Sequence, residues 1–391
     1  MNIDLAKLLI ISNTAHHRQD GQIVGHAPTA REISQLASKF ARVHHIGCLH
    51  EGRASAMMQP YSSERVRLIP IPPAGGDTLW EKAAVLKVAM KYVVTIMREL
   101  RELDGNDDVV HIRCPAPVSL IALALMTVVR FPRKRWVKYA GNWQPRRMDS
   151  FGYGFQRWWL KWNFSRASVT VNGYWPDQAA HIAAFVNPCL TRDEIAEGRK
   201  RNSSKLPLAP LRLIFVGQVN KKKGVGRALE IVKRLLDRKL EVAFDVIGDG
   251  PERAAFEVQA ARDLGGKVTF HGWQPRSALG PFLSRAHLML LPSDSEGWPK
   301  VLSEGMAYGV VPVASDVSSI PQYLRECGVG VTFNPHDIEG FVTAIVDYAC
   351  HPMRWQLESE RSMAGAVRFT YDAYLENVSR LLKLEQCAER P

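Results

Sequence analysis

Two carboxylates and a lysine in the second half of the chain have side chains suited to a ligand that carries both sugar hydroxyls and phosphate. Glu296 lies in the stretch "SDSEGWP", and Glu304 follows eight positions later in a segment that predicts a helix. Carboxylates accept hydrogen bonds from hydroxyl groups, whereas they repel a bare phosphate. Lys223, in "VNKKKGVG", supplies a point charge suited to a phosphate.

Three glycine-containing stretches of the second half each follow a predicted strand. They are "VGQVNKKKGVG" (216–226), "IGDGPER" (247–253) and "SDSEGWPKVLSEGMAYG" (293–309). The third leads into a helix whose first free N–H groups, at about Lys300 and Val301, point at an anion with the help of the helix dipole. A glycine after a strand is often only a turn. Three such loops at one edge of a sheet nevertheless predict a phosphate site.

The two carboxylates fit a nucleotide sugar bound beside this phosphate site. Glu304, about one turn into the predicted helix, suits the paired hydroxyls of a ribose, as an acidic residue does in dinucleotide-binding folds. Glu296, in the loop before the helix, suits a hydroxyl of a sugar attached beyond the diphosphate. The alternative for Glu304 is an acid near the start of a helix that only complements the helix dipole.

Short apolar runs alternate with amphipathic stretches along the chain, a pattern typical of βαβ units. In the first half the predicted strands are 7–12, 43–48, 66–71, 108–112, 135–140 and 168–172. In the second half they are 211–217, 242–250, 267–272, 287–293 and 310–315. The charged segment between the halves lacks a period and predicts an interdomain linker. The pattern therefore predicts two doubly wound α/β domains that bind ligands beyond the carboxyl ends of their strands, in a cleft between them.

Composition and length agree with two globular domains. The chain has 391 residues, of which 46% are hydrophobic and 23% are charged, with a formal net charge of +12. The six cysteines show no CxxC pair and no regular spacing, so neither a zinc site nor a disulfide framework is predicted, and a reducing, cytoplasmic setting fits best. The first residues read as a buried strand rather than a signal peptide. The apolar run 116–129 is shorter than the roughly 20 residues that cross a bilayer.

Four motifs of the second half are specific in their order and spacing. They are "FVGQVNKKKGVGRALEIVKRL", "DVIGDGPERAAFE", the stretch from "VTFHGWQPRS" to "SSIPQYL", and "RFTYDAYLENVSRLLKL". Together they resemble the donor-binding half of the retaining glycosyltransferases of family 4 (glycosyl transferases group 1), over residues 211–387. The resemblance implies a GT-B fold, in which two Rossmann-like doubly wound parallel-sheet domains face a central cleft. The implied parts are an acceptor-binding domain (1–188), a linker (189–209), a donor-binding domain (210–368) and a C-terminal helix that crosses back to the first domain (369–391).

The resemblance also assigns roles to matching positions. Glu296 corresponds to the family glutamate that contacts the donor sugar, Glu304 to the one that binds the ribose, and Lys223 to the lysine that neutralises the diphosphate. Lys223 and Glu296 are therefore the candidate catalytic residues. The candidate donor-binding residues are Gly217, Gln218, Lys223, Gly248, His271, Trp273, Gly297, Trp298, Pro299, Lys300, Val301 and Glu304. The family usually needs no metal and no cofactor, since the nucleotide-diphosphate sugar is a co-substrate and cationic groups replace Mg²⁺.

The sequence departs from the family pattern at two places. Gln218 stands where the family commonly has an arginine, so one of two diphosphate cations is missing, and Lys221, Lys222 or an arginine of the first domain is the candidate to replace it. In the first domain, "KYAGNWQP" stands where many relatives have a histidine close to the reacting sugar. The acceptor-side candidates are Gly25, Arg113 and Asn142. Strand-end packing is the alternative for Arg113, and a turn asparagine is the alternative for Asn142.

The reaction that the resemblance implies is sugar transfer with retention of anomeric configuration to a saccharide or lipid-linked saccharide, in bacterial cell-surface polysaccharide biosynthesis. The departing diphosphate itself takes the proton of the acceptor. Two other functions stay open. A nicotinamide-dependent oxidoreductase is disfavoured because no G-x-G-x-x-G follows the first strand. A non-catalytic nucleotide-sugar-binding protein of the same fold is compatible with the change at Gln218.

The segment 130–166 predicts contact with a membrane surface. It holds ten Lys and Arg against the single acid Asp149, with tryptophans interleaved, including Trp158, Trp159 and Trp162. Aromatic residues favour the membrane interface, and basic residues are attracted to anionic headgroups. The alternative is that Trp159 and Trp162 belong to the core and the cations to a solvated face. The chain shows no nucleic-acid-binding motif, so no nucleic-acid partner is predicted.

Overall fold

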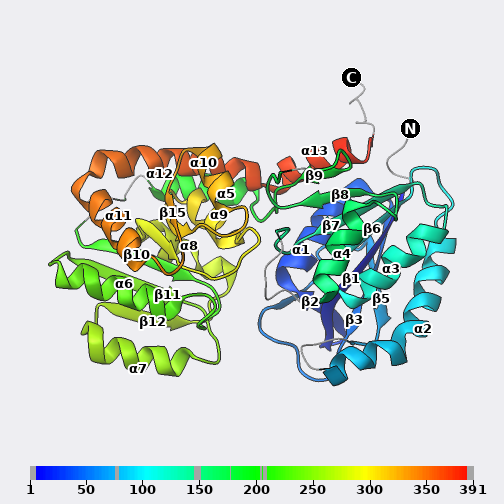
Figure 1. The fold of residues 1–391 in the computed structure, drawn as a ribbon, viewed down its shortest axis with the longest axis horizontal. Helices are drawn as coiled ribbons and strands as arrows, with labels where there is room; N and C mark the ends of the chain where they lie inside the picture. The colour runs from blue at the N-terminus through cyan, green and yellow to red at the C-terminus, as the bar shows by residue number, and fades with distance from the viewer. Residues whose placement is uncertain are drawn as a thin grey trace. The chain divides into compact units, whose positions relative to one another are not determined.

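The computed structural model describes residues 6–74, 79–144, 151–176, 178–202, 205 and 209–384, without the side chains of 79–86. The chain divides into two compact units, each built around a largely parallel sheet (Figure 1). Unit 1 consists of Met1–Phe185 together with Tyr374–Pro391, and unit 2 consists of Val186–Ala373. The predicted α/β class with two Rossmann-like domains is confirmed.

Unit 1 has a nine-stranded sheet. Its parallel strands, in pairing order, are β5 (Val66–Ile71), β3 (Arg42–Leu49), β1 (Lys7–Gln19), β6 (Val109–Cys114), β7 (Lys134–Tyr139), β8 (Ser168–Val171) and β9 (Ile182–Ala184). The end of β1 forms an antiparallel hairpin with β2 (Gln22–His26), which pairs in turn with β4 (Met58–Pro60). The predicted first strand therefore runs seven residues further than 7–12, into the hairpin.

Helices cover both faces of this sheet. They are α1 (Ala27–Leu36), η2 (Ala37–Lys39), α2 (Leu79–Arg101), α3 (Pro117–Val128), α4 (Phe151–Lys161) and α13 (Tyr371–Leu381). Successive residues of a strand point to opposite faces. Accordingly, Leu8 and Ile10 pack in one core with side chains of α1 and α13, whereas Leu9 and Ile11 pack in the other core with side chains of α2, α3 and α4. Figure 1 shows α2 and α3 side by side along one side of unit 1.

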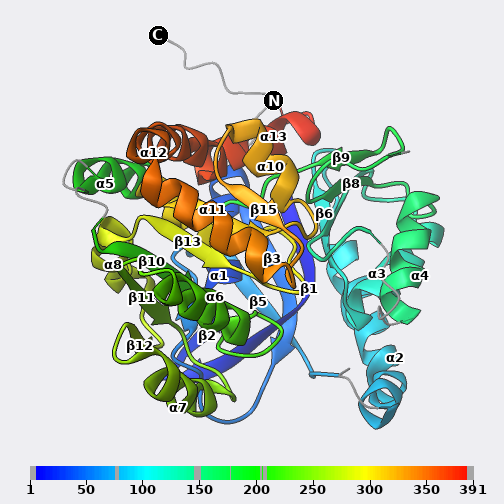
Figure 2. The same ribbon diagram turned by 60° about the vertical axis from the view of Figure 1, so that its left-hand side comes forward.

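Unit 2 has a six-stranded parallel sheet. Its strands, in pairing order, are β12 (Val268–Gly272), β11 (Val242–Ile247), β10 (Leu211–Val216), β13 (Leu288–Leu291), β14 (Val311–Ser315) and β15 (Val331–Phe333). The helices are α5 (Arg192–Asn202), α6 (Val225–Asp237), α7 (Arg253–Leu264), η3 (Arg276–Ala278), α8 (Gly280–Arg285), α9 (Lys300–Ala307), α10 (Ile320–Cys327), α11 (Ile338–Cys350), α12 (Pro352–Ala366) and η4 (Val367–Phe369). Helix α6 contacts α7 and α11 (Figure 2). Helix α5 contacts α8, α9 and α12, and α12 also contacts α11. The strand order reverses between β10 and β13, which is the switch point where doubly wound sheets bind ligands.

The segment 189–209, which was predicted to be an interdomain linker, contains helix α5 and falls within unit 2. A capping box starts the helix: the N–H of Thr191 donates to Oε2 of Glu194 (2.8 Å), and the N–H of Glu194 donates to Oγ1 of Thr191 (3.2 Å). The buried side chain of Ile195 then anchors α5 in the core of unit 2. The T-x-x-E spacing of Thr191 and Glu194 indicates a capping box. The helix was nevertheless not predicted, because the segment has few apolar residues.

Candidate functional site

The carboxyl edge of the unit 2 sheet holds the glycine-containing loops against one another. The N–H of Gly217 donates to the carbonyl of Ile247 (2.9 Å), and the N–H of Gly248 donates to the carbonyl of Gly272 (2.8 Å). Gly248 has φ +138°, and a Cβ at this position would lie 1.8 Å from the carbonyl oxygen of Gly217. Only glycine permits this approach, so the loops after β10 and β11 form one continuous backbone surface.

Lys223 and Glu296, the two candidate catalytic residues, contact each other directly. Lys223 follows β10 and Glu296 follows β13, and Nζ of Lys223 lies 2.7 Å from Oε1 of Glu296. The two loops are joined by the N–H of Asp294, which donates to the carbonyl of Lys222 (2.9 Å). The Lys223 side chain is 31% exposed and that of Glu296 is 8% exposed. The ammonium group of Lys223 thus lies at the carboxyl edge of the sheet, in contact with the less exposed carboxylate of Glu296.

Arg227 is a residue of this edge that the sequence interpretation missed. Its Nε and Nη2 donate to the carbonyl of Pro292 (2.9 and 2.7 Å), and Nη2 lies 2.8 Å from Oδ1 of Asp294. Arg227 fixes the start of the loop that carries Glu296. Its position in the first turn of α6, directly after the loop that carries Lys223, was the available signal.

The turn into α9 presents backbone rather than side chains to a ligand. Pro299 is the N-cap residue of α9, so the N–H groups of Lys300 and Val301 lie in the first turn, where a helix has no internal acceptors for them. The ring of Trp298 is buried, stacks on Phe369 at 4.7 Å and donates from Nε1 to Oγ of Ser303 (2.8 Å). The buried side chain of Trp298 therefore anchors the loop to the core of unit 2.

Glu304, in the second turn of α9, forms an ion pair with Arg276. The sequence interpretation missed Arg276, which lies 28 positions earlier in the loop after β12. The guanidinium of Arg276 also contacts Glu194 (Nε to Oε1, 2.9 Å) and donates to the carbonyl of Cys189 (2.6 Å). Burial lowers the pKa of Arg276, but the carboxylates of Glu304 and Glu194 outweigh that effect and raise it.

The remaining donor-side candidates differ in how firmly they are held. Nε2 of His271 lies 2.6 Å from Oδ1 of Asp245, and the imidazole packs on Phe282 at 4.7 Å. The neighbouring Trp273 is 38% exposed and offers an aromatic face to solvent. Gln218 is exposed, and its Oε1 accepts a hydrogen bond from Nδ2 of Asn220 (2.9 Å). The base-binding role predicted for His271 and Trp273 stays a prediction.

Comparison with known proteins relates most of unit 2 to a family of glycosyltransferases. Residues 197–352 match the family described as glycosyl transferases group 1. The match covers most of unit 2. The chain is 23% identical over 205 residues to the lipopolysaccharide 1,6-galactosyltransferase of Escherichia coli, covering 51% of this chain and 55% of that protein. It is 34% identical over 123 residues to the amylovoran biosynthesis glycosyltransferase AmsK of Erwinia amylovora, covering 30% of each.

The whole chain has the fold of solved GT-B glycosyltransferases. Sucrose-phosphate synthase from Thermosynechococcus elongatus superposes with a TM-score of 0.72 at 17% identity, covering 97% of this chain and 98% of that one. WaaG, a glycosyltransferase involved in lipopolysaccharide biosynthesis, superposes with a TM-score of 0.60 at 14% identity, covering 97% and 100%. The GT-B prediction is confirmed. The chain spans about half or less of the length of the curated relatives it matches.

In unit 1, Arg113 serves as a largely buried ion-pair partner. Its Nη1 lies 2.7 Å from Oε1 of Glu32, which is also 2.7 Å from Nζ of Lys138 and accepts from the hydroxyl of Tyr374 (3.2 Å). Burial lowers the pKa of Arg113, but the charge of Glu32 outweighs it and raises the pKa. This arrangement matches the strand-end packing alternative, and an acceptor role for Arg113 stays a prediction.

Gly25 makes room for a buried histidine of unit 1. A Cβ at Gly25 would lie 2.6 Å from Cδ2 of His16, whose imidazole lies between Gly25 and Gly47. Nε2 of His16 lies 2.7 Å from the hydroxyl of Tyr61, which lies 2.6 Å from Nδ1 of His45. Burial lowers the pKa of His16 to about 4, so the imidazole is neutral near pH 7. The sequence interpretation missed this network because its members are far apart along the chain.

Asn142 shapes its own turn. Its Oδ1 accepts a hydrogen bond from the N–H of Gln144 (3.1 Å), which is the local pattern of an Asx turn. The turn alternative for Asn142 therefore matches the structure. Whether the same residue contacts an acceptor stays a prediction.

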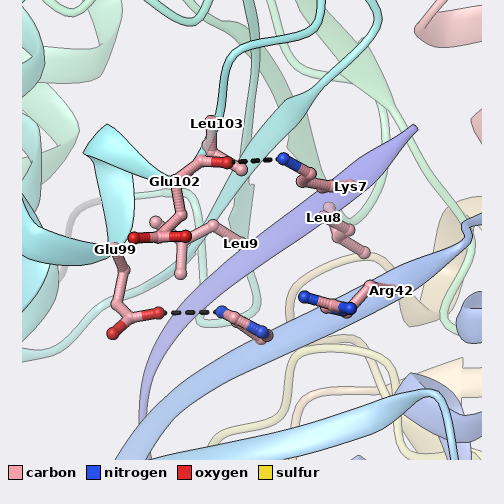
Figure 3. A pocket seen from close by; sticks show the side chains of 8 residues that line it. Lys7, Leu8, Leu9, Arg42, Glu99, Glu102 and Leu103 are labelled. Carbon is pink, nitrogen blue, oxygen red and sulfur yellow. Dashed lines mark hydrogen bonds and ion pairs between the residues drawn. The ribbon is translucent and has the colours of Figure 1, made fainter. Parts of the chain in front are cut away.

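A pocket of unit 1 lies at the start of its strands (Figure 3). Nζ of Lys7 donates to the carbonyl of Glu102 (2.8 Å), and Nδ1 of His44 lies 2.8 Å from Oε2 of Glu99. These contacts join the end of α2 to the amino ends of β1 and β3. Doubly wound sheets bind their ligands at the opposite, carboxyl ends of the strands, so this pocket is not the predicted site.

Proposed function

We propose that the protein transfers a sugar from a nucleotide-diphosphate sugar to a saccharide or lipid-linked saccharide, with retention of anomeric configuration, in bacterial cell-surface polysaccharide biosynthesis. The observation that carries the proposal is the contact of Lys223 with Glu296 at the carboxyl edge of a group 1 domain, beside the first turn of α9. Two relatives support the setting, since their names place them in lipopolysaccharide and amylovoran synthesis.

Lys223 and the first turn of α9 bind the donor diphosphate in this proposal. The ammonium of Lys223 leaves the carboxylate of Glu296 for a phosphate oxygen, while the N–H groups of Lys300 and Val301 donate to the same diphosphate. Glu296 is then available to accept a hydrogen bond from a hydroxyl of the donor sugar. Stabilising charge on the leaving group is commonly the largest single contribution that such a site makes to catalysis.

Retention follows from attack on the face that the diphosphate leaves. The bond between the anomeric carbon and the diphosphate oxygen breaks, and the acceptor oxygen bonds to the anomeric carbon on the same face. The acceptor proton moves to the departing diphosphate oxygen, so no side chain acts as an obligatory base. We propose that the reaction needs no metal ion.

The proposal extends to the inner face of the cytoplasmic membrane, where lipid-linked acceptors occur. Phe151, Phe155, Trp158 and Trp162 follow one another at spacings of four, three and four along α4 and its end, which places them on one face of the helix. Phe151 is 87% exposed and Trp162 is 66% exposed, so Trp162 is not a core residue. No helix in the described part of the chain is both long and apolar enough to span a bilayer.

Calorimetric titration with UDP, GDP, ADP and NAD, followed by a turnover assay with sugar esters of the nucleotide that binds, tests the proposal. Lys223→Ala lowers kcat by about 100-fold, because removing one preorganised donor costs on the order of 3 kcal/mol. Lys267→Ala, an exposed lysine before the start of β12 at the other end of the sheet, is the matched control and changes nothing.

Three outcomes contradict the proposal. Binding of NAD alone supports the oxidoreductase, and nucleotide binding without turnover of any sugar ester supports the non-catalytic binding protein. An unchanged kcat in Lys223→Ala removes Lys223 from the site. Turnover is measured with and without EDTA, and loss of activity on chelation contradicts the metal-free reaction.

A further inference from the structure

Arg276 connects the carboxylate of Glu304 to helix α5. One guanidinium contacts Oε1 of Glu304, both carboxylate oxygens of Glu194 (2.9 and 3.3 Å) and the carbonyl of Cys189 (2.6 Å). The planar guanidinium of Arg276 therefore interacts with four acceptor oxygens that belong to three residues. The protein itself therefore determines the orientation of this guanidinium.

A hydrogen bond fixes the side chain of Glu194, and this side chain in turn holds the guanidinium of Arg276. Its Oε2 accepts from the N–H of Thr191 (2.8 Å) in the capping box of α5. Leu190, Leu279 and Leu283 line a small pocket beside these charges together with Glu194, Arg276 and Glu304. An apolar wall strengthens the interaction between charged groups, since it keeps water away.

The arrangement leaves one oxygen of Glu304 for a ligand. Arg276 occupies Oε1, and in the part of the chain that the structure describes Oε2 of Glu304 has no hydrogen-bond partner. The Glu304 side chain is 14% exposed, so the carboxylate is close to solvent while most of the residue is covered. A carboxylate that is held by one oxygen offers the other in a defined direction.

We propose that Arg276 is a positioning residue that aims Oε2 of Glu304 at a ribose hydroxyl and thereby makes the protein select ribonucleotides over 2′- or 3′-deoxyribonucleotides. The inference rests on the proposed function, in which Glu304 binds the ribose. Arg276 does not contact the nucleotide. It acts by restricting the carboxylate to the orientation in which it accepts from the ribose, because a polar site built around a hydroxyl rejects the analogue that lacks it.

Calorimetric dissociation constants of UDP, GDP or ADP, whichever binds the wild type, and of its 2′-deoxy and 3′-deoxy analogues test the inference. The wild type prefers the ribonucleotide to at least one analogue by about tenfold or more, as expected for a hydrogen bond to a charged group. Arg276→Gln weakens ribonucleotide binding and leaves binding of that analogue unchanged, so the preference falls to the value found for Glu304→Gln. Arg276→Lys, which keeps the charge without the planar guanidinium, gives an intermediate preference.

Two further variants separate positioning from general stability. Glu194→Gln lowers the preference part of the way and adds nothing in the Arg276→Gln background, since both changes act on one chain of contacts. Arg234→Gln removes an ion-paired arginine from the last turn of α6 and leaves the preference intact. Circular dichroism and the thermal midpoint of each variant show whether it folds.

The experiment distinguishes failure of this inference from failure of the proposed function. An unchanged preference in Arg276→Gln overturns the inference, and so does an equal loss of affinity for the ribonucleotide and both analogues, which shows a purely structural role. Absence of binding of all three diphosphates to the wild type overturns the proposed function itself, and this inference with it.

Discussion

At the scale of single residues, the candidate site pairs two of its carboxylates with cationic side chains. Lys223 is paired with Glu296, and Glu304 is paired with Arg276. In the proposed function, a diphosphate displaces the carboxylate of Glu296 from Lys223 and releases that carboxylate for a sugar hydroxyl. The site is thus held together before the donor arrives, at the cost of one ion pair that the diphosphate replaces.

Gly25 is a residue whose lack of a side chain we expect to matter for stability. In Gly25→Ala the new methyl group meets the imidazole of His16, so we expect the free energy of unfolding to fall by about 1–3 kcal/mol. Urea unfolding at pH 7.5 measures the change. Gly154→Ala is the matched control, because in α4 its Cβ would meet only Nη2 of Arg157 at 4.0 Å, an ordinary contact, and alanine favours a helix by about 0.5–1 kcal/mol. Equal stabilities of the two variants would show that the His16 ring yields without cost.

Sequence reasoning reached the residues whose motif is local and missed those whose partners are distant. Lys223, Glu296 and Glu304 stand in recognisable loops, and the structure brings the first two into contact. Arg276 stands 28 positions before Glu304 and 82 after Glu194, so only the fold shows that they meet. Periodicity and spacing along one segment carry no information on which segments are neighbours.

At the scale of elements, the strands were predictable and the irregular additions were not. The core strands are runs of apolar residues that the sheet buries on both faces. Strands β2 and β4 form a short antiparallel extension, and β9 and β15 have only three residues each, too few to show a pattern. Helix α5 was missed because its buried face is narrow, with Ile195 and Gly198 as its buried residues.

Helix α4 is the element whose exposed face we expect to bind anionic lipid. Trp158→Ser combined with Trp162→Ser should weaken co-sedimentation with phosphatidylglycerol-containing vesicles by about tenfold or more, since two exposed aromatic side chains lose their contact with the interface. Lys161 and Arg166 are exposed beside them, so binding should also fall with added salt. Met90→Ser removes an exposed apolar side chain from α2 and is the control.

The lipid prediction has two clear contradictions. Wild-type protein that stays in the supernatant with anionic vesicles would remove membrane contact from the proposal. Binding that is equal for phosphatidylcholine vesicles and insensitive to salt would show that charge is not involved. The cations of 145–150 lie outside the described residues, so the prediction rests on the aromatic face of α4 and its two neighbouring cations.

At the scale of the whole molecule, each unit holds a histidine that burial keeps neutral. Burial lowers the pKa of His16 in unit 1 and of His287 in unit 2 to about 4 each. In the unfolded chain both imidazoles have a pKa near 6.5. Between pH 6.5 and pH 4 the unfolded chain therefore binds more protons than the folded one, and the free energy of unfolding falls as the pH falls. Both units should lose stability in the same window of pH.

The size of this acid effect follows from the shifts. A difference of about 2.5 in pKa corresponds to about 3 kcal/mol for each histidine once the pH has fallen to about 4. Urea unfolding at pH 7.5, 6.0 and 5.0 measures the slope. His16→Gln and His287→Gln should each flatten it, since glutamine does not titrate, and the double variant should flatten it by the sum because the two sites lie in separate units. A slope that neither variant changes would mean that other groups, such as the fully buried His45 and His111, whose pKa values burial also lowers, govern the acid response.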